Sequence, residues 1–440
     1  MHYRWIISLT FAFIWIDTPN LVDAKDTIVH PLSTESTQQK LDDLEHKYEE
    51  QNREIKELKR EIKQQRRGAF SSAIARFNPK IALNGLFTAA GFSDDEPLNF
   101  GAHDPKENGF NVQALELNFR GAIDPYFSAQ FNLNTLIEEG ETIVELEEGF
   151  LTTQALPYNV QLMGGQFFTR FGNMNHIHAH DWDFVDQPII LNRLLGPDGL
   201  RGPGLQASWL APTPFYLEFI GSAQQARGEI ASSFLGKEGE TVGGHILDKR
   251  AINDPNDLLY MPRVVSAFDF TDAMTLKVGG SALLGPNSSS PDARTHIYGA
   301  DMKLKWQPRR TMMGYPFVSW ESEIIYRDHE AGANKENAIL EETLEDWGLY
   351  SQIIYGFKPR WVAGLRFEYA DGHGGIDQIN DDLRNERYRL SPNISWGTSE
   401  FSRLRLQYNL DFAESRGHEV LHGFFLQWSF ALGEHGAHQF

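Results

Sequence analysis

The feature that most constrains the fold is a two-residue alternation of apolar and polar side chains that recurs from about residue 77 to the carboxyl terminus. In the segment 404–412, the even positions hold Leu, Leu, Tyr, Leu and Phe, and the odd positions hold Arg, Gln, Asn and Asp. A period of two places these two sets on opposite faces of a strand. Because the pattern recurs behind an apolar export signal, we predict an all-β fold, a transmembrane antiparallel β-barrel with lipid outside and water inside.

The amino terminus resembles a secretory signal peptide over residues 1–24. The apolar run Trp5–Ile16 follows Arg4, and a cleavage site fits after Ala24. No run of 18 apolar residues exists, which excludes a helical membrane protein. The chain has no Cys, as suits a protein that crosses an oxidising compartment and needs no disulfide.

The chain is acidic, with a formal net charge of −20. Residues 68–440 hold 29 Lys and Arg against 48 Asp and Glu, a net charge of −19, so the acidity belongs to the predicted barrel. Such a field disfavours nucleic acid as a partner and attracts cations, including the divalent ions that bridge lipopolysaccharide. The alternative is that most of these acids lie on solvated loops.

Residues 25–76 form a predicted periplasmic segment that contains a short α-helical coiled coil. Heptad seam positions between 38 and 67 are apolar in six cases out of eight, and the other two hold Gln. The apolar seam residues are Leu41, Leu44, Tyr48, Ile55, Leu58 and Ile62. A helix with so narrow a stripe needs partner helices, and the alternative is a charged linker.

About sixteen strands are predicted between residues 77 and 432. Most odd-numbered gaps between them are long loops (92–109, 169–202, 225–260, 329–342 and 371–383), and most even-numbered gaps are tight turns. This asymmetry is typical of outer-membrane barrels and places the amino-terminal helix and the short turns in the periplasm. Tryptophans at predicted strand ends would form aromatic girdles: Trp209, Trp306, Trp320, Trp361, Trp396 and Trp428. The alternation of the last strand fits Phe430, so residues 433–440 are an expected histidine-containing tail.

The export signal, coiled coil and acidic barrel together resemble the porins of Gram-negative bacteria, and most closely the phosphate-selective porin group. The resemblance implies a homotrimer assembled through the coiled coil, in contact with outer-membrane lipid and lipopolysaccharide. It fails at the selectivity determinant, because those porins carry lysine and arginine ladders in the lumen. The inward candidates here are mixed in charge: Arg403, Arg405, Asp411, Asp301, Glu116 and Glu368. Phosphate selectivity is therefore not expected.

The predicted loop 169–202 is the third long loop. In porins, which this chain resembles, that loop commonly folds into the lumen and forms the constriction. The charged residues predicted to line such a constriction are Arg170, Asp181, Asp183, Asp186, Arg193 and Arg201. Opposed charges of this kind would build a transverse field across the channel.

Three histidines in this loop are candidate metal ligands. In an extended segment, His176, His178 and His180 would share one face, about 6.6 Å apart. With Asp181 or Asp183 they would hold zinc or another divalent ion weakly and exchangeably, and no other cofactor is expected. The alternative is that they are loop hydrogen-bonders packed against Trp182. The tail residues His435 and His438 are a second candidate metal contact.

The segment 176–188, together with the tail, also resembles barrels described as zinc-regulated outer-membrane proteins, a label that concerns expression. No Gly-x-Ser-x-Gly, P-loop or His-Glu-x-x-His motif is present, so no enzymatic activity is expected. The leading hypothesis is a passive, cation-leaning channel for ions or small solutes. The alternatives are a barrel for zinc or other divalent-metal uptake, and a structural anchor of the outer membrane.

Overall fold

A computed structural model describes residues 79–138, 140–333, 338–376, 380–417 and 419–433, together with Lys56. The chain divides into two units, Met1–Arg76 and Phe77–Phe440. The predicted signal peptide, the predicted coiled-coil segment apart from Lys56, and the tail that carries His435 and His438 lie outside the described residues. Those three predictions therefore remain predictions.

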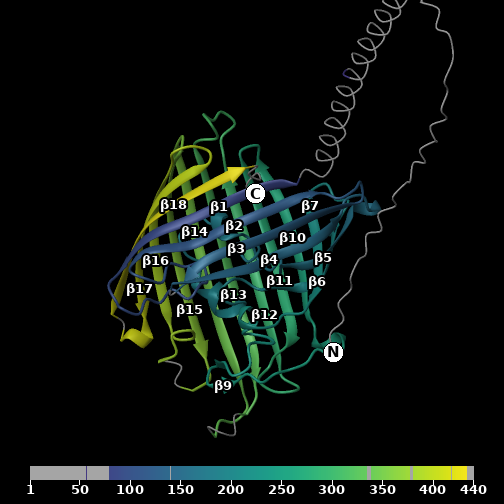
Figure 1. The fold of residues 1–440 in the computed structure, drawn as a ribbon, viewed down its shortest axis with the longest axis vertical. Helices are drawn as coiled ribbons and strands as arrows, with labels where there is room; N and C mark the ends of the chain where they lie inside the picture. Colours follow the sequence, from purple (N-terminus) through teal and green to yellow (C-terminus); the bar gives the residue numbers. More distant parts are fainter. Residues whose placement is uncertain are drawn as a thin grey trace, which may run out of the picture. The chain divides into compact units, whose positions relative to one another are not determined.

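Sixteen antiparallel strands close into one barrel, as the alternation predicts (Figure 1). Consecutive strands of the ring are neighbours, and β1 closes the barrel by pairing with β18. The strands of the barrel are β1 (Lys80–Phe92), β2 (Gly109–Ala122), β3 (Phe127–Glu138), β4 (Glu141–Thr153), β5 (Val160–Phe168), β6 (Arg201–Leu210), β7 (Tyr216–Gln224), β10 (Leu259–Thr271), β11 (Met274–Pro286), β12 (Arg294–Trp306), β13 (Phe317–Ala331), β14 (Glu342–Lys358), β15 (Trp361–His373), β16 (Arg387–Gly397), β17 (Ser402–Ala413) and β18 (Val420–Gly433).

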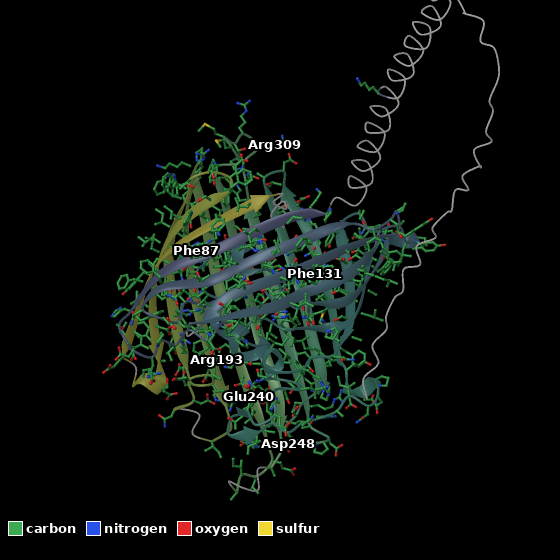
Figure 2. The ribbon with its side chains drawn as sticks, viewed as in Figure 1. Phe87, Phe131, Arg193, Glu240, Asp248 and Arg309 are labelled. Carbon is green, nitrogen blue, oxygen red and sulfur yellow. The ribbon has the colours of Figure 1, made fainter. Side chains whose placement is uncertain are left out.

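The barrel is polar inside and apolar outside. Along β17, Leu406 is 56% exposed, whereas the adjacent Gln407 is 1% exposed because it points into the filled interior. The outward rings and aliphatic chains of neighbouring strands continue this apolar surface, as Phe131 illustrates on β3 (Figure 2). The predicted inward residues Arg405, Asp411, Asp301, Glu116 and Glu368 are all buried. A chain that buries its charges and exposes its leucines is suited to lipid rather than water on its outer face.

Short and long connections lie at opposite ends of the barrel. The β10–β11 turn has two residues, 272–273, whereas the β5–β6 and β7–β10 connections span 169–200 and 225–258. Figure 2 shows Arg309 at the turn end and Asp248 at the loop end. Two connections depart from the alternation, since β3 and β4 are joined by residues 139–140 at the loop end and β12 and β13 by 307–316 at the turn end.

The described connections contain little regular structure. A two-stranded hairpin, β8 (Thr241–Val242) with β9 (His245–Ile246), lies within 225–258. The segment 169–200 holds one α-helix, α2 (Ile189–Leu195), and one 3-10 turn, η2 (Ala179–Asp181). The other 3-10 turns are η1 (Pro157–Asn159), η3 (Glu229–Ala231), η4 (Pro255–Asp257) and η6 (Glu414–Arg416). Within the described ranges, no helix has the length and apolar character needed to cross a membrane.

Candidate functional site

The segment 169–200 lies inside the barrel and contacts strands on several sides. Backbone N–H groups of the segment donate to inward side chains, from Asn173 to Glu323 Oε1 (2.7 Å) and from Val185 to Gln407 Oε1 (2.8 Å). The N–H of Ile189 at the start of α2 donates to Glu368 Oε2 (2.7 Å). The negative charge of this carboxylate also interacts favourably with the positive end of the helix dipole. These acceptors come from β13, β17 and β15, whereas His178 of the same segment contacts Glu147 and Glu148 on β4, on the other side of the ring. The segment therefore crosses the lumen rather than lying over its mouth.

A glycine makes the first of these contacts possible. Gly172 has φ +61°, and a Cβ built there would lie 2.2 Å from Glu323 Oε2. The turn lets Glu323 Oε1 accept from two consecutive N–H groups, those of Asn173 (2.7 Å) and Met174 (2.9 Å). A side chain at position 172 would obstruct this close approach as well as strain the backbone.

Asp186 anchors the middle of the segment to the wall formed by β15, β16 and β17. Its carboxylate forms ion pairs with Arg366 Nη2 on β15 (2.5 Å) and Arg389 Nη1 on β16 (3.2 Å). It also accepts a hydrogen bond from Asn409 Nδ2 on β17 (2.6 Å). Burial by itself would raise the pKa of Asp186, but the charges of Arg389 and Arg366 hold this pKa well below its usual value. The aspartate is therefore ionised and fully paired.

Apolar side chains of the segment fill the loop half of the barrel interior. Five apolar residues of α2, among them Ile190 and Leu195, are buried against inward side chains near the loop ends of the strands, such as Leu283 and Ile297. This packing forms an apolar core inside a barrel whose remaining interior is polar.

The turn half of the interior contains a cavity of about 490 Å³. Its wall includes Arg120, Gln130 and Gln161 near the turn ends of their strands, and the segment 173–183 bounds it on the loop side. The infolded segment thus separates a polar cavity at one end of the barrel from an apolar core at the other.

Charges of opposite sign face one another across this cavity. Glu116 on β2 and Lys303 on β12 are eight positions apart in the ring of sixteen strands, so they are on opposite walls. Lys303 is itself paired with Glu321 (2.9 Å). The charged lining residues are Arg120, Arg170, Lys277 and Lys303 with Glu116, Glu148, Asp181, Asp183 and Glu321. The cavity is therefore nearly balanced in charge, although residues 68–440 are strongly acidic.

Two of the three predicted histidines meet carboxylates. His178 contacts Glu147 through Nδ1 (3.0 Å) and Glu148 through Nε2 (3.0 Å), and His180 Nδ1 contacts Glu116 Oε2 (2.6 Å). Burial opposes protonation of both rings, but Glu116 and the neighbouring carboxylates raise the pKa of His178 well above, and that of His180 above, the usual value.

The expected single face of three imidazoles is wrong. Residues 172–176 turn and Ala179–Asp181 form a 3-10 turn, so the segment is not extended. His176 lies apart from the carboxylates, where burial and the charges of Arg170 and Arg263 lower its pKa well below the usual value. Nearby positive charges disfavour a metal ion at His176, whereas His178 and His180 contact carboxylates.

The predicted constriction residues divide into two groups. Arg170, Asp181 and Asp183 line the cavity. The other three are buried anchors outside the cavity lining: Asp186 as described, Arg193 through Asn385 O (2.8 Å), and Arg201 through Glu145 (2.8 Å) and Asp198. For these three, the predicted lining role is corrected to a structural one, because Asp186 and Arg201 are held in buried ion pairs and Arg193 in buried hydrogen bonds.

A histidine that the sequence did not single out completes the acid–histidine cluster. His103, in the connection 93–108, lies with Nε2 2.7 Å from Asp198 Oδ1 and 3.2 Å from Glu147 Oε1. Burial opposes its protonation, but Asp198 and Glu147 raise the pKa of His103 well above the usual value. Its partners lie 44 and 95 positions further along the chain, so no local spacing could reveal the group.

Comparison with known proteins places the chain in a family and identifies its fold. No known family model matches the sequence. An uncharacterized protein of Aquifex aeolicus is 30% identical over 355 residues, which cover 76% of this chain and 71% of that protein. The solved structures with similar folds include the anion-selective porin of Comamonas acidovorans, with a TM-score of 0.51 and 8% identity over 80% of this chain and 99% of that one.

Two further porin structures have the same fold. The channel DcaP of Acinetobacter baumannii has a TM-score of 0.51 and 11% identity over 80% of this chain and 96% of that one. OprB of Pseudomonas putida has a TM-score of 0.52 and 10% identity over 83% and 97%. The chain therefore belongs to the family of the Aquifex aeolicus protein and has the closed sixteen-strand fold of Gram-negative outer-membrane porins.

Proposed function

We propose that the chain is an outer-membrane channel for passive diffusion of ions or small polar solutes. The observation that carries this proposal is the polar cavity of about 490 Å³ inside a barrel with an apolar outer face. Charged groups on opposite walls suit hydrated ions and polar molecules, and they disfavour apolar ones.

The infolded segment decides what passes. A solute that enters the cavity meets residues 173–183, and Asp186 fixes this segment to β15 and β16 through buried ion pairs. Passage then depends on this segment and on the apolar core behind it, so the size of the solutes that pass is determined there.

We also propose a preference for cations, based on the acidity of residues 68–440 and on the wall formed by Glu116 and Glu148. Acidic surfaces raise the local concentration of cations at both mouths. The near balance of charge inside the cavity favours a modest preference rather than a strict one.

Conductance across a planar bilayer under a salt gradient tests both statements. We expect discrete channel currents and a reversal potential of the cation-selective sign. An anion-selective reversal potential would overturn the cation preference. Absence of any conductance by the folded protein would overturn the channel and favour the structural-anchor alternative.

The absence of Cys allows a sharper test of the route. Gln130 lines the cavity, whereas the next residue on β3, Phe131, points outward. A water-soluble thiol reagent should reduce the current of Gln130→Cys and leave that of Phe131→Cys unchanged. Equal effects on both variants would contradict diffusion through this cavity.

Capture and uptake of zinc or another divalent ion is the second candidate function. It is favoured by the position of His178 and His180 beside Glu116 on the cavity wall. Proteoliposomes with an internal zinc-sensitive dye would distinguish uptake from simple diffusion, because only a capture site saturates at micromolar zinc.

The remaining proposals concern assembly and location. We propose a homotrimer in outer-membrane lipid and lipopolysaccharide, joined through a periplasmic coiled coil in residues 25–76. Deletion of residues 25–67 should leave a folded barrel and lower the mass of the detergent-solubilised assembly. An unchanged mass would contradict assembly through this segment.

A further inference from the structure

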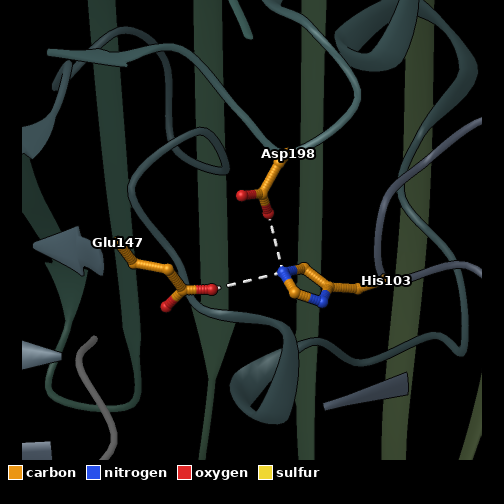
Figure 3. A group of neighbouring side chains, drawn as sticks. All are labelled: His103, Glu147 and Asp198. Atoms are coloured by element: carbon orange, nitrogen blue, oxygen red, sulfur yellow. Dashed lines mark ion pairs between the residues drawn. The ribbon is translucent and has the colours of Figure 1, made fainter. Parts of the chain in front are cut away.

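Three parts of the chain bring His103, Glu147 and Asp198 together inside the barrel (Figure 3). His103 comes from the connection 93–108, Glu147 from β4, and Asp198 from the end of the infolded segment. Their three ligand atoms, one imidazole nitrogen and two carboxylate oxygens, lie within 4.8 Å of one another, and all three residues are buried. Figure 3 shows both carboxylates directed at the same ring nitrogen.

The other nitrogen of His103 fixes the orientation of the ring. His103 Nδ1 lies 3.0 Å from the backbone carbonyl oxygen of Gln113, which can only accept, so Nδ1 donates its hydrogen. In neutral imidazole, Nε2 then has a free lone pair on the side of Asp198, Glu147 and the amide of Asn134 (3.3 Å). A backbone carbonyl that accepts from the far nitrogen is the usual support of a metal-bound histidine.

A second group of ligands lies on the other oxygen of Glu147. His178 Nδ1 is 3.0 Å from Glu147 Oε2 and 3.4 Å from Glu116 Oε1. Glu116 is 2% exposed, and among the described residues its Oε1 accepts no hydrogen bond. Apart from the His178 imidazole at 3.4 Å, this buried carboxylate oxygen has no donor among the described residues, so it is a candidate ligand for a cation.

The charge of the cluster also calls for a cation. Four buried carboxylates, those of Glu116, Glu147, Glu148 and Asp198, surround the three imidazoles of His103, His178 and His180. Among the ion pairs of the described strands and loops, the permanently charged partner of these four is Arg201, which pairs with Asp198. Buried charges need compensation, which either protonated imidazoles or a bound cation must supply.

We propose that His103, Glu147 and Asp198 bind a divalent transition-metal ion of the zinc class. Glu116 and His178 line the path by which the ion reaches this site from the cavity. Imidazole with carboxylate suits zinc and its neighbours, whereas magnesium and calcium favour sites made of oxygen alone. Zinc holds such ligands at about 2.0–2.2 Å, so the three atoms need only small side-chain shifts to converge on it, with water as the fourth ligand.

The bound ion would join the connection 93–108 and the infolded segment to Glu147 on the barrel wall. The site rests on the proposed channel only for the route by which the ion arrives, because His178 and Glu116 border the cavity. Binding itself needs no transport, so the two can be tested separately.

The test uses the full chain in detergent, stripped of metal by a chelator and titrated with ZnCl₂ by calorimetry, with the bound metal counted by elemental analysis. We expect one tightly bound zinc per chain. His103→Gln and Glu147→Gln should each weaken binding by at least about tenfold, since even the loss of a supporting residue costs that much. His176→Gln is the matched control: His176 is a half-buried histidine of the same segment, it has no ion pair with a carboxylate among the described residues, and the variant should bind as the unaltered chain does.

A measurement on the unaltered chain avoids any folding defect of the variants. X-ray absorption of the zinc-loaded protein should show nitrogen and oxygen ligands with imidazole scattering. Failure of the unaltered chain to retain zinc, or unchanged binding by a His103→Gln variant with native circular dichroism, would overturn the site and leave a network of protonated imidazoles. Conductance recorded on the same preparation separates the outcomes: current without zinc binding overturns the site alone, and zinc binding without current overturns the channel alone.

Discussion

Arg366 Nη2 lies 2.5 Å from Asp186 Oδ1, and neither side chain is exposed. The pair joins β15 to the infolded segment 180 positions earlier in the chain, and Arg389 on β16 binds the second carboxylate oxygen at 3.2 Å. Removing one member of a buried ion pair leaves an uncompensated charge, at a cost of about 3–5 kcal/mol. The position of the segment across the lumen therefore depends on this one carboxylate more than on any single apolar contact.

Asp186→Asn should release the segment. Arg366 and Arg389 would then share the single carboxylate of Glu368, which leaves one buried positive charge uncompensated. We expect docking to weaken by about 3–5 kcal/mol, with a larger and noisier conductance and faster proteolysis within 169–200. Asp183→Asn is the control, because Asp183 borders the cavity and contributes a backbone carbonyl, rather than its carboxylate, to Asn393. Identical conductance of Asp186→Asn and the unaltered chain would contradict the anchoring role.

The same carboxylate predicts a pH dependence. The pKa of Asp186 is held below its usual value, so the docking energy it supplies is present above the ordinary carboxyl pKa, about 3.9, and is lost as the pH falls through the lower folded value. The difference in proteolytic protection between the unaltered chain and Asp186→Asn should therefore stay constant from pH 8 to pH 5 and shrink only below about pH 4. A difference that disappears near pH 6 would show that another group controls docking.

Gly172→Ala should disturb the turn that leads into the segment. The left-handed conformation costs alanine about 1–2 kcal/mol relative to glycine, and the added Cβ also meets the carboxylate of Glu323. Gly417→Ala is a matched control, because Gly417 has φ +64° and no atom lies within 4 Å of the position that an added methyl group would take. We expect a lower thermal transition for Gly172→Ala than for Gly417→Ala, and equal transitions would indicate that Glu323 moves aside freely.

The barrel could be predicted from the sequence because its signals are local. Alternation with a period of two appears within each strand, as in β17, and turn and loop lengths can be counted directly. The register of inward residues such as Arg405 and Asp411 followed from the same pattern. Predictions about the interior failed where they treated a loop as an extended strand, as for His176.

The candidate site could not be predicted because its partners are distant in sequence. His103 and Asp198 are 95 positions apart, and Asp186 and Arg366 are 180 apart. The sequence presents Arg193, Arg201 and Asp186 as charged loop residues, and only the fold reveals that each is buried with a partner. Charged residues that line a constriction and charged residues that anchor a loop are of the same types, so only their positions in the fold distinguish them.

Lys277→Glu should shift ion selectivity toward cations. Lys277 lines the cavity on β11, on the wall that faces Glu116 and Glu148, so the change replaces a positive charge on the route with a negative one. Lys237→Glu makes the same change on a loop residue that is 61% exposed, where salt screens it more strongly. The reversal potential under a salt gradient should move for Lys277→Glu by more than for Lys237→Glu. Equal shifts would place the selectivity at the mouth instead of the cavity.

Leu406→Arg tests the assignment of the outer face. Leu406 lies in the middle of β17 and pairs with Ile394 on β16 and Leu426 on β18, so its neighbours are outward apolar residues. An arginine on the lipid face costs about 2–4 kcal/mol at the bilayer midplane and about 0–1 kcal/mol near the interface.

Val420→Arg, at the loop end of β18, is the control for depth. Reversible denaturant unfolding in lipid should give a loss near the larger value for Leu406→Arg and near the smaller one for Val420→Arg. Equal losses would contradict a membrane centred on Leu406, whereas a graded loss would fix the depth of the barrel in the bilayer.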